Sequence, residues 1–195
     1  MKPVEKVSGG LIVGCLMAIT LGAQDKPLPV PTFDGVFYRY DRLAGTLVDL
    51  EHQTAAVASK PKALGFGGYK AFFYLRGARS PVRFKTNNPS EFIVSLPPRT
   101  DPHTIQFFVL RQGKNRRELV EQESNRPSPL GVGQSHNIMD QSEVPFEIQK
   151  YGESSYRLIP SKPLAPGEYS FSFSTNNVAY AFGIDGPDGS GPQGK

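Results

Sequence analysis

Hydrophobic and polar side chains alternate along two neighbouring segments near the C-terminus. Aromatic residues occupy every second position from Tyr169 to Phe173, with serines between them. A second alternating run, from Val178 to Ile184, follows after a short turn at Asn176 and Asn177. Successive side chains of a strand point to opposite faces. The pattern therefore predicts a β-hairpin with one aromatic face and one small polar face.

Short runs rich in aromatic and β-branched residues recur through the chain, bounded by Gly, Pro, Asn or Asp. Such runs predict strands. We expect strands at residues 36–40, 44–50, 69–75, 82–86, 91–96, 104–111, 117–122, 145–150, 155–159, 168–174 and 178–184. Regularly spaced strands without alternating helices predict an all-β fold, a sandwich of two antiparallel sheets.

Three segments differ from this pattern. Residues 105–110 are apolar on both faces, which predicts a strand at the middle of the core. Residues 117–122 are more polar, which favours a sheet edge or an exposed face. Residues 47–59 contain Glu51, His52 and several alanines and are compatible with a short helix or a loop.

The N-terminus has the layout of an export signal. Lys2 and Lys6 precede a mostly apolar stretch, and small residues follow at Gly22 and Ala23. Residues 1–23 are therefore expected to be a cleaved signal peptide, too weakly apolar for a stable membrane span. Two alternatives are a retained N-terminal anchor and a lipoprotein acylated at Cys15, although the apolar run continues beyond that cysteine.

The remaining chain divides into three parts. Residues 24–33 contain three prolines at alternate positions and predict an extended linker. Residues 34–185 form the predicted β-sandwich domain, consistent with the 18 prolines and 20 glycines among 195 residues, which favour many turns. Residues 186–195 lose apolar side chains and predict a disordered tail.

Charge and cysteine usage narrow the classes of partner. Removal of residues 1–23 lowers the formal net charge from +4 to +3 and leaves no cysteine. A chain without disulfides suits export to a bacterial envelope or the extracellular space. The densest basic cluster, Lys114 to Arg117, is followed at once by glutamates, so a solvated strand or loop is favoured over nucleic-acid binding.

The stretch from Leu164 to Tyr169 resembles the tyrosine corner of immunoglobulin-like and fibronectin III-like sandwiches. In those folds the tyrosine hydroxyl bonds to the backbone a few residues upstream. The resemblance implies that Tyr169 fixes the corner formed by Pro166 and Gly167 and that Leu164 packs beneath it. There is no Trp and no Cys pair to fill the centre, so Phe and Tyr must do so. The whole layout is similar to uncharacterised secreted bacterial proteins, a likeness that carries no activity.

Candidate chemistry is sparse. His52, His103 and His136 lack metal-ligand spacing, and Ser135 lacks the Gly-x-Ser-x-Gly context of a nucleophile. Residues 65–69 resemble a phosphate loop only in their glycines. We therefore predict no catalytic, cofactor-binding or metal-binding residues. Six aromatic residues on strand runs could either pack in the core or stack on a ligand at the surface. They are Phe37, Tyr38, Tyr40, Phe72, Phe73 and Tyr74.

These observations favour an exported, non-enzymatic binding or scaffolding domain, located in the periplasm, at the cell surface or outside the cell. Its expected partner is an envelope protein or a glycan, bound through a sheet face, an edge or the loop at residues 123–144. One alternative is a small secreted hydrolase whose acid and base come from distant strands, with His103 or His136 near a carboxylate. Another is a subunit of an envelope assembly.

Overall fold

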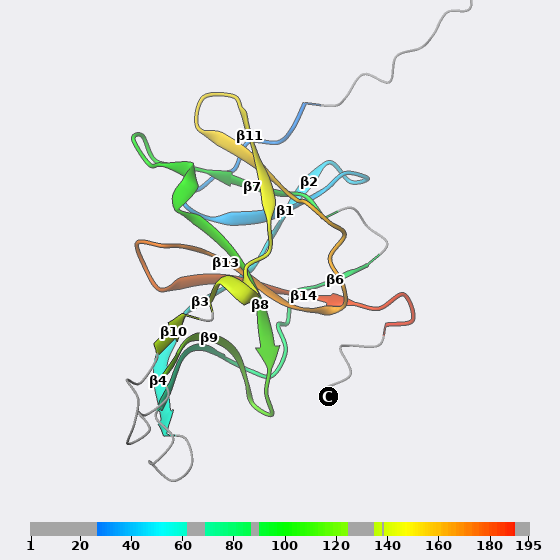
Figure 1. Cartoon of the computed structure of the whole chain (residues 1–195). Helices are drawn as coiled ribbons and strands as arrows, with labels where there is room; N and C mark the ends of the chain where they lie inside the picture. The colour runs from blue at the N-terminus through cyan, green and yellow to red at the C-terminus, as the bar shows by residue number, and fades with distance from the viewer. Residues whose placement is uncertain (1–26, 62–68, 87–89, 125–134, 138, 190–195) are drawn as a thin grey trace, which may run out of the picture.

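The computed structural model describes residues 27–61, 69–86, 90–124, 135–137 and 139–189. These residues form two sheets that pack together and are antiparallel except where Arg83–Lys85 runs parallel to Val178–Asp185. The regular structure between the strands amounts to 3₁₀ turns at Pro102–Thr104 and Met139–Ser142. Figure 1 shows the smaller sheet above the strands β13 and β14 of the larger one. The predicted all-β sandwich is thereby confirmed.

The smaller sheet has five strands in the order β11-β12-β7-β1-β2. Their bounds are β1 Phe37–Asp41, β2 Thr46–Asp49, β7 Phe92–Ser95, β11 Phe146–Tyr151 and β12 Ser155–Pro160. All four pairings are antiparallel. The β7 strand is fully apolar and buried from Phe92 to Val94 because it lies in the middle of this sheet.

The larger sheet runs in the order β3-β14-β13-β8-β9-β5-β4, with β6 added beside β14 and β10 beside β9. Its bounds are β3 Glu51–Thr54, β4 Ala56–Pro61, β5 Tyr69–Arg76, β6 Arg83–Lys85, β8 Ile105–Gln112, β9 Arg116–Ser124, β10 Ser135–Asn137, β13 Gly167–Phe173 and β14 Val178–Asp185. The two end strands of this order, β3 and β4, are joined through the single residue Ala55. Strands from opposite ends of the order therefore lie next to each other at Ala55, which requires the sheet to curl round on itself. We call it the curled sheet.

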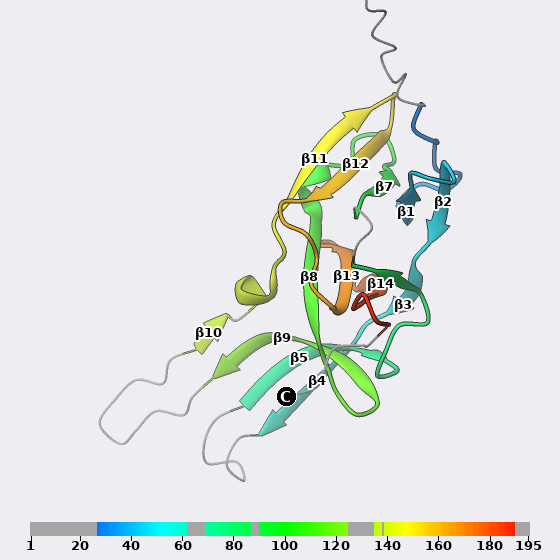
Figure 2. The same cartoon turned by 90° about the vertical axis from the view of Figure 1, so that its right-hand side faces the viewer.

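The strand β8 belongs to both halves of the molecule. Its N-terminal part pairs with β13, whereas Arg111 and Gln112 pair with β9. Figure 2 shows β8 running from the sandwich into the part of the curled sheet formed by β9, β5 and β4. Phe107 packs in the sandwich core, and Phe108 packs in a second cluster on the opposite face. The sequence predicted a strand at the middle of the core, and β8 does lie in the middle of the curled sheet with clusters on both faces, although Val109 is 38% exposed.

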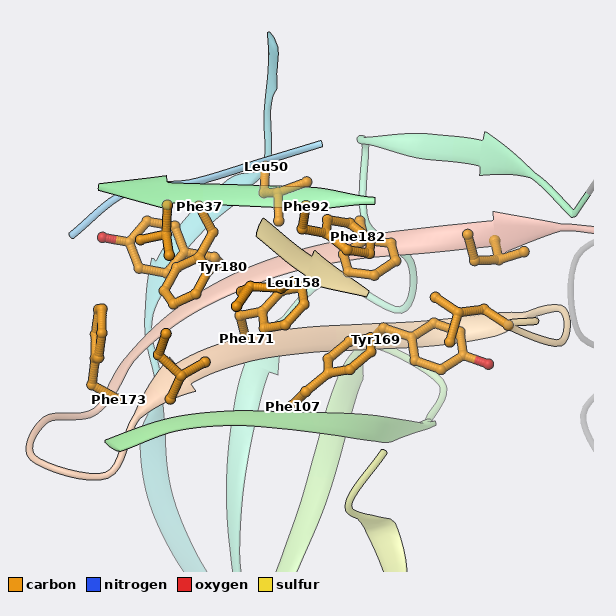
Figure 3. Close-up of a cluster of buried hydrophobic side chains, with 14 of the residues drawn as sticks. Phe37, Leu50, Phe92, Phe107, Leu158, Tyr169, Phe171, Phe173, Tyr180 and Phe182 are labelled. Atoms are coloured by element: carbon orange, nitrogen blue, oxygen red, sulfur yellow. The ribbon is translucent and has the colours of Figure 1, made fainter. Parts of the chain in front are cut away.

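The sandwich core is built mainly of aromatic rings that converge from the two sheets (Figure 3). Phe171 is fully buried and stacks on Phe107 at 4.1 Å and on Phe37 at 5.0 Å between ring centroids. Phe92 meets Phe182 at 4.8 Å from the other side. These rings occupy the centre of the core in a chain that has no tryptophan.

The Pro-Gly turn before β13 has a defined hydrogen bond. The Tyr169 hydroxyl donates to the Ala165 carbonyl at 2.8 Å, and burial raises the pKa of this phenol. Leu164 is buried in the sandwich core. Gly167 lies against the Tyr169 ring so closely that a Cβ there would be 3.2 Å from a ring carbon. The turn and the first residues of β13 are therefore held in one arrangement.

Two local predictions were wrong. Residues 47–59 form neither a helix nor a loop but parts of β2, β3 and β4, because pairing with β1, β14 and β5 outweighs the helical preference of the alanines. The polar segment at residues 117–122 lies within β9, inside the sheet between β5 and the strands β8 and β10. Arg117 on this strand is completely buried.

The segment before the first strand contacts the domain. Pro31 is buried, and the Tyr151 hydroxyl donates to the Pro29 carbonyl at 2.8 Å. The described residues leave out the predicted signal peptide at 1–23 with Cys15, residues 24–26 of the linker, residues 125–134 and 138 of the 123–144 loop, and residues 190–195 of the tail. No helix within the described part is long and apolar enough to cross a membrane.

Candidate ligand-binding cavity

The strands β13 and β14 present different faces to the two sides of their sheet. Their aromatic residues enter the sandwich core. Their opposite face carries small side chains, and the register places Ser170 beside Ala181 and Ser172 beside Ala179. This small face lies on the concave side of the curled sheet. Because serine and alanine side chains are short, this face fills little of the space enclosed by the curled sheet.

A cavity of about 330 Å³ lies against this small wall. Apolar side chains of β5, β8 and β9 line the opposite side, namely Phe73, Leu75, Phe108, Leu110 and Leu119. Leu75, Phe108, Leu110 and Leu119 are buried, so this wall is part of a packed cluster. The space remains because the long side chains of one wall face serines and alanines on the other.

Polar residues surround the open side of the cavity. Ser174, Asn176 and Asn177 are exposed and belong to the turn between β13 and β14. The Asn177 amide donates to the Ala55 carbonyl at 3.2 Å, and the Ala55 N–H donates to the Asn177 carbonyl at 2.8 Å. The turn is thus fastened to the residue that joins β3 to β4. Hydroxyl and amide groups stand at the entrance, where they can bond to water or to a ligand.

An arginine closes the inner end. Arg117 is fully buried, and its guanidinium donates to both carboxylate oxygens of Glu51 at 2.6 and 2.9 Å. It also donates to the carbonyls of Arg76 at 2.8 Å and Gly77 at 3.1 Å. Although burial opposes the shift, hydrogen bonds from Arg117 and neighbouring side chains hold the pKa of Glu51 below its usual value.

A second carboxylate extends this ion network. Glu168 on β13 is buried, lies 3.9 Å from Arg117, and accepts hydrogen bonds from the Ser80 N–H at 2.8 Å and from Arg83 at 2.6 Å. Arg83 also pairs with Asp185 at 2.7 Å, and hydrogen bonds from Arg83 lower the pKa of that carboxyl. The network ties β3, β6, β9, β13 and β14 together at the inner end of the cavity.

Gly183 makes room for this network. A Cβ at this position would lie 2.1 Å from a guanidinium nitrogen of Arg83, far inside contact distance. Only glycine therefore allows Arg83 to cross β14 and reach Glu168. The charged groups at the inner end are paired with one another, and among them Arg117 belongs to the cavity lining.

The chemistry of the lining suits binding of an uncharged group. Within the described chain, the lining residues are apolar or neutral polar, apart from Arg117, whose charge is already matched by Glu51. Burial of a neutral polar group without a hydrogen-bond partner costs roughly 2–7 kcal/mol. Burial of an unpaired ligand charge would cost more than that. An apolar group would instead contact Phe73, Leu110 and Leu119, while neutral polar atoms could bond at the rim.

Of the histidines whose side chains the structure describes, neither His52 nor His103 lines the cavity. His52 on β3 stacks on Tyr180 with ring centroids 5.1 Å apart, and His103 lies in the 3₁₀ turn before β8. His136 lies on β10, and its side chain is outside the described part, as are residues 65–68. Over the described ranges no group of three His, Cys, Asp or Glu residues could hold a metal ion. The hydrolase alternative stays a prediction.

The six aromatic residues singled out in the sequence differ in how deeply they are buried. Phe37, Tyr38, Tyr40 and Phe72 are buried. Phe73 and Tyr74 are partly buried; the Phe73 side chain lines the cavity, whereas the Tyr74 ring lies against Arg116 on the other face of β5. Sequence reasoning missed the buried ion pair of Arg117 and Glu51. Arg117 was assigned to a solvated basic cluster, and Glu51 to a segment compatible with a helix or a loop. The small polar face of β13 was the one signal of the cavity that the sequence contained.

Comparison with known proteins adds no relative to this description: no family pattern matches the chain, and neither a characterised protein of similar sequence nor a solved structure of similar fold was found.

Proposed function

We propose that this chain is a non-enzymatic binding protein that takes an uncharged, mainly apolar group into the cavity of the curled sheet. The observation that carries the proposal is an open space of about 330 Å³ with an apolar wall, a hydroxyl-bearing wall and an amide rim. Ligand sites in proteins are concave, mostly apolar and carry a few placed polar groups, with volumes of roughly 300–1,000 Å³. This cavity is at the small end of that range.

The geometry also supports a preferred orientation of the ligand. The apolar part would lie inside, against Leu110 and Leu119, where it gains contacts that water does not provide. Neutral polar atoms of the ligand would remain near Ser172 and Asn177 at the open side. An amphipathic, uncharged small molecule or the apolar end of a larger envelope component fits this arrangement.

We also propose that the protein is exported and that its sandwich has an immunoglobulin-like or fibronectin III-like corner. The apparent export signal supports an exported protein that acts in the bacterial envelope, at the cell surface or outside the cell. The Tyr169–Ala165 hydrogen bond supports an immunoglobulin-like or fibronectin III-like corner within the sandwich. Mass spectrometry of the mature N-terminus would test export through a cleaved leader: a chain that begins at Gln24 supports it, and a chain that keeps Met1 and stays inside the cell contradicts it.

Binding can be tested with the full chain and the neutral fluorescent probe N-phenyl-1-naphthylamine. We expect saturable binding and a rise in fluorescence. Ser172→Phe fills the small wall and should weaken binding about tenfold or more, about 1.4 kcal/mol. Ser161→Phe is the matched control, because Ser161 is exposed and does not line the cavity. Absence of saturable binding, or equal binding by both variants, would refute the proposal.

A further inference from the structure

A second, chemically different hollow lies on the convex face of the curled sheet. Side chains alternate along β9, so Arg116 and Glu118 point away from the cavity that Arg117 and Leu119 line. The hollow has a volume of about 590 Å³ and includes four cationic side chains, Lys60, Arg111, Lys114 and Arg116. We call it the cationic hollow.

One carboxylate organises these cations. Glu118, whose side chain is 8% exposed, accepts a hydrogen bond from Arg111 at 2.7 Å and one from Arg116 at 2.7 Å. The Lys60 ammonium lies 3.9 Å from the same carboxylate. Three positive groups from three strands, β4, β8 and β9, therefore converge on a single negative group.

Aromatic rings hold the cations from below. The Arg116 guanidinium lies 4.8 Å from the ring centre of Phe72 and 5.1 Å from that of Tyr74. The Lys60 ammonium lies 5.3 Å from the centre of the Phe72 ring. Such contacts stabilise a cation by roughly 0.5–1 kcal/mol at exposed sites and restrict its orientation. Phe72 is itself buried, so the platform is rigid.

The cationic hollow keeps unused hydrogen-bond donors. Within the part of the chain that the structure describes, Arg111 bonds only through one terminal nitrogen and Arg116 only through Nε. Among the lining residues that the structure describes, four positive charges stand against one carboxylate. Arg111 and Lys60 are 64% and 62% exposed, so their remaining N–H groups are accessible to a ligand.

We propose that the cationic hollow binds a phosphate-bearing ligand. Guanidinium groups match the oxygen geometry of phosphate through paired N–H donors, and lysines add charge without a fixed direction. Phosphate carries enough negative charge to satisfy several of the surplus cations at once. The ligand would displace no protein contact, because Glu118 already holds the arginines in place from the inner side.

Two arms of one experiment distinguish the source of the phosphate. Calorimetric titration of the full chain with tripolyphosphate tests a free phosphate ligand. Sedimentation with vesicles of phosphatidylglycerol, against vesicles of phosphatidylcholine, tests a lipid headgroup. Binding in either arm should weaken strongly between about 0.05 and 0.5 M NaCl, because the contact is ionic.

The decisive variant is Arg111→Gln with Lys114→Gln, which removes two exposed charges and leaves the Arg116–Glu118 pair intact. We expect at least an about tenfold loss of phosphate binding. Lys150→Gln with Lys162→Gln removes the same charge at exposed positions elsewhere and should bind nearly as the parent does. No binding in either arm, or equal losses in both double variants, would overturn the proposal. Probe binding in the cavity should be unchanged in all of them.

Discussion

The two sides of the strands β13 and β14 differ in how completely they are filled. On the sandwich side, Phe171 and Phe182 meet rings from the opposite sheet and the core is closed. On the concave side of the curled sheet, Ser172 and Ala179 face a cavity of about 330 Å³. The backbone pairing is the same for both sides, so the contrast lies in the size of the side chains and in the elements that each face meets.

The comparison also shows how each side is stabilised. The sandwich side depends on contacts among aromatic rings, which need no partner of opposite charge. The inner end of the curled sheet depends on the buried Arg117, Glu51 and Glu168, which keep strands together around a space that apolar packing does not fill. The two sides should therefore respond differently to substitution and to pH.

The largest effect is expected at the centre of the filled side. Phe171→Ala removes a fully buried ring that stacks on Phe37 and Phe107, and it should lower the free energy of unfolding by about 3–5 kcal/mol. Urea denaturation followed by tyrosine fluorescence or circular dichroism measures this. Phe33→Ala, at a residue that is 64% exposed, should change stability by less than about 0.5 kcal/mol. Similar losses in both variants would contradict a ring-packed core.

The next effect concerns the ion pair at the inner end. Glu51→Gln keeps the shape but removes the charge that faces the buried Arg117, and should cost about 1.5–3 kcal/mol at neutral pH. Because the folded state lowers the pKa of Glu51, its stabilisation is present at neutral pH and is lost as the pH falls below about 4.3 and through the lowered pKa. The difference between parent and variant should thus shrink in acid. A constant difference from pH 7 to pH 3 would argue against the ion pair.

A third prediction adds volume on each side. Val94→Phe places a ring in the filled sandwich, where Val94 is fully buried, and should cost about 1–3 kcal/mol. Ala179→Leu extends into the cavity and should be neutral or stabilise by up to about 1 kcal/mol. Thermal unfolding of the two variants in parallel measures the contrast. Equal destabilisation would mean that the concave side is already full.

The smallest expected effect lies at the corner before β13. Tyr169→Phe keeps the ring and removes the hydroxyl that donates to the Ala165 carbonyl, which should cost about 0.5–1.5 kcal/mol. The binding of N-phenyl-1-naphthylamine should not change, since Tyr169 points into the sandwich core. Chemical denaturation gives the first quantity and fluorescence titration the second. A loss of probe binding would show that the two sides are not independent.

Most of the strands could be predicted from the sequence because alternation is a local property. The long segment from Glu51 to Pro61 could not, since Ala55, Ala56 and Ala58 favour a helix by intrinsic preference. It becomes extended by pairing with β14, far away in the chain, and with β5. That same segment curls the sheet, so the missed strand is also the reason that the cavity was missed.

The candidate site was only half visible in the sequence. The small polar face of Ser170 and Ser172 is a local pattern, and it can be read directly. What that face meets depends on long-range pairing, which a single sequence does not reveal. Arg117 illustrates the same limit, because its burial requires Glu51, which lies 66 positions earlier. The local indication of its burial was that Arg117 shares one face of the strand with Leu119, two positions along.

Chemical-shift mapping by ¹H–¹⁵N NMR during titration with N-phenyl-1-naphthylamine tests most directly whether the curled sheet encloses a usable binding space. We expect saturable shifts for the amides of Ser172, Ala179 and Leu119, whereas those of Phe37 and Phe92 in the five-stranded sheet should not move. Shifts centred on the five-stranded sheet, or no saturable shifts at all, would contradict it.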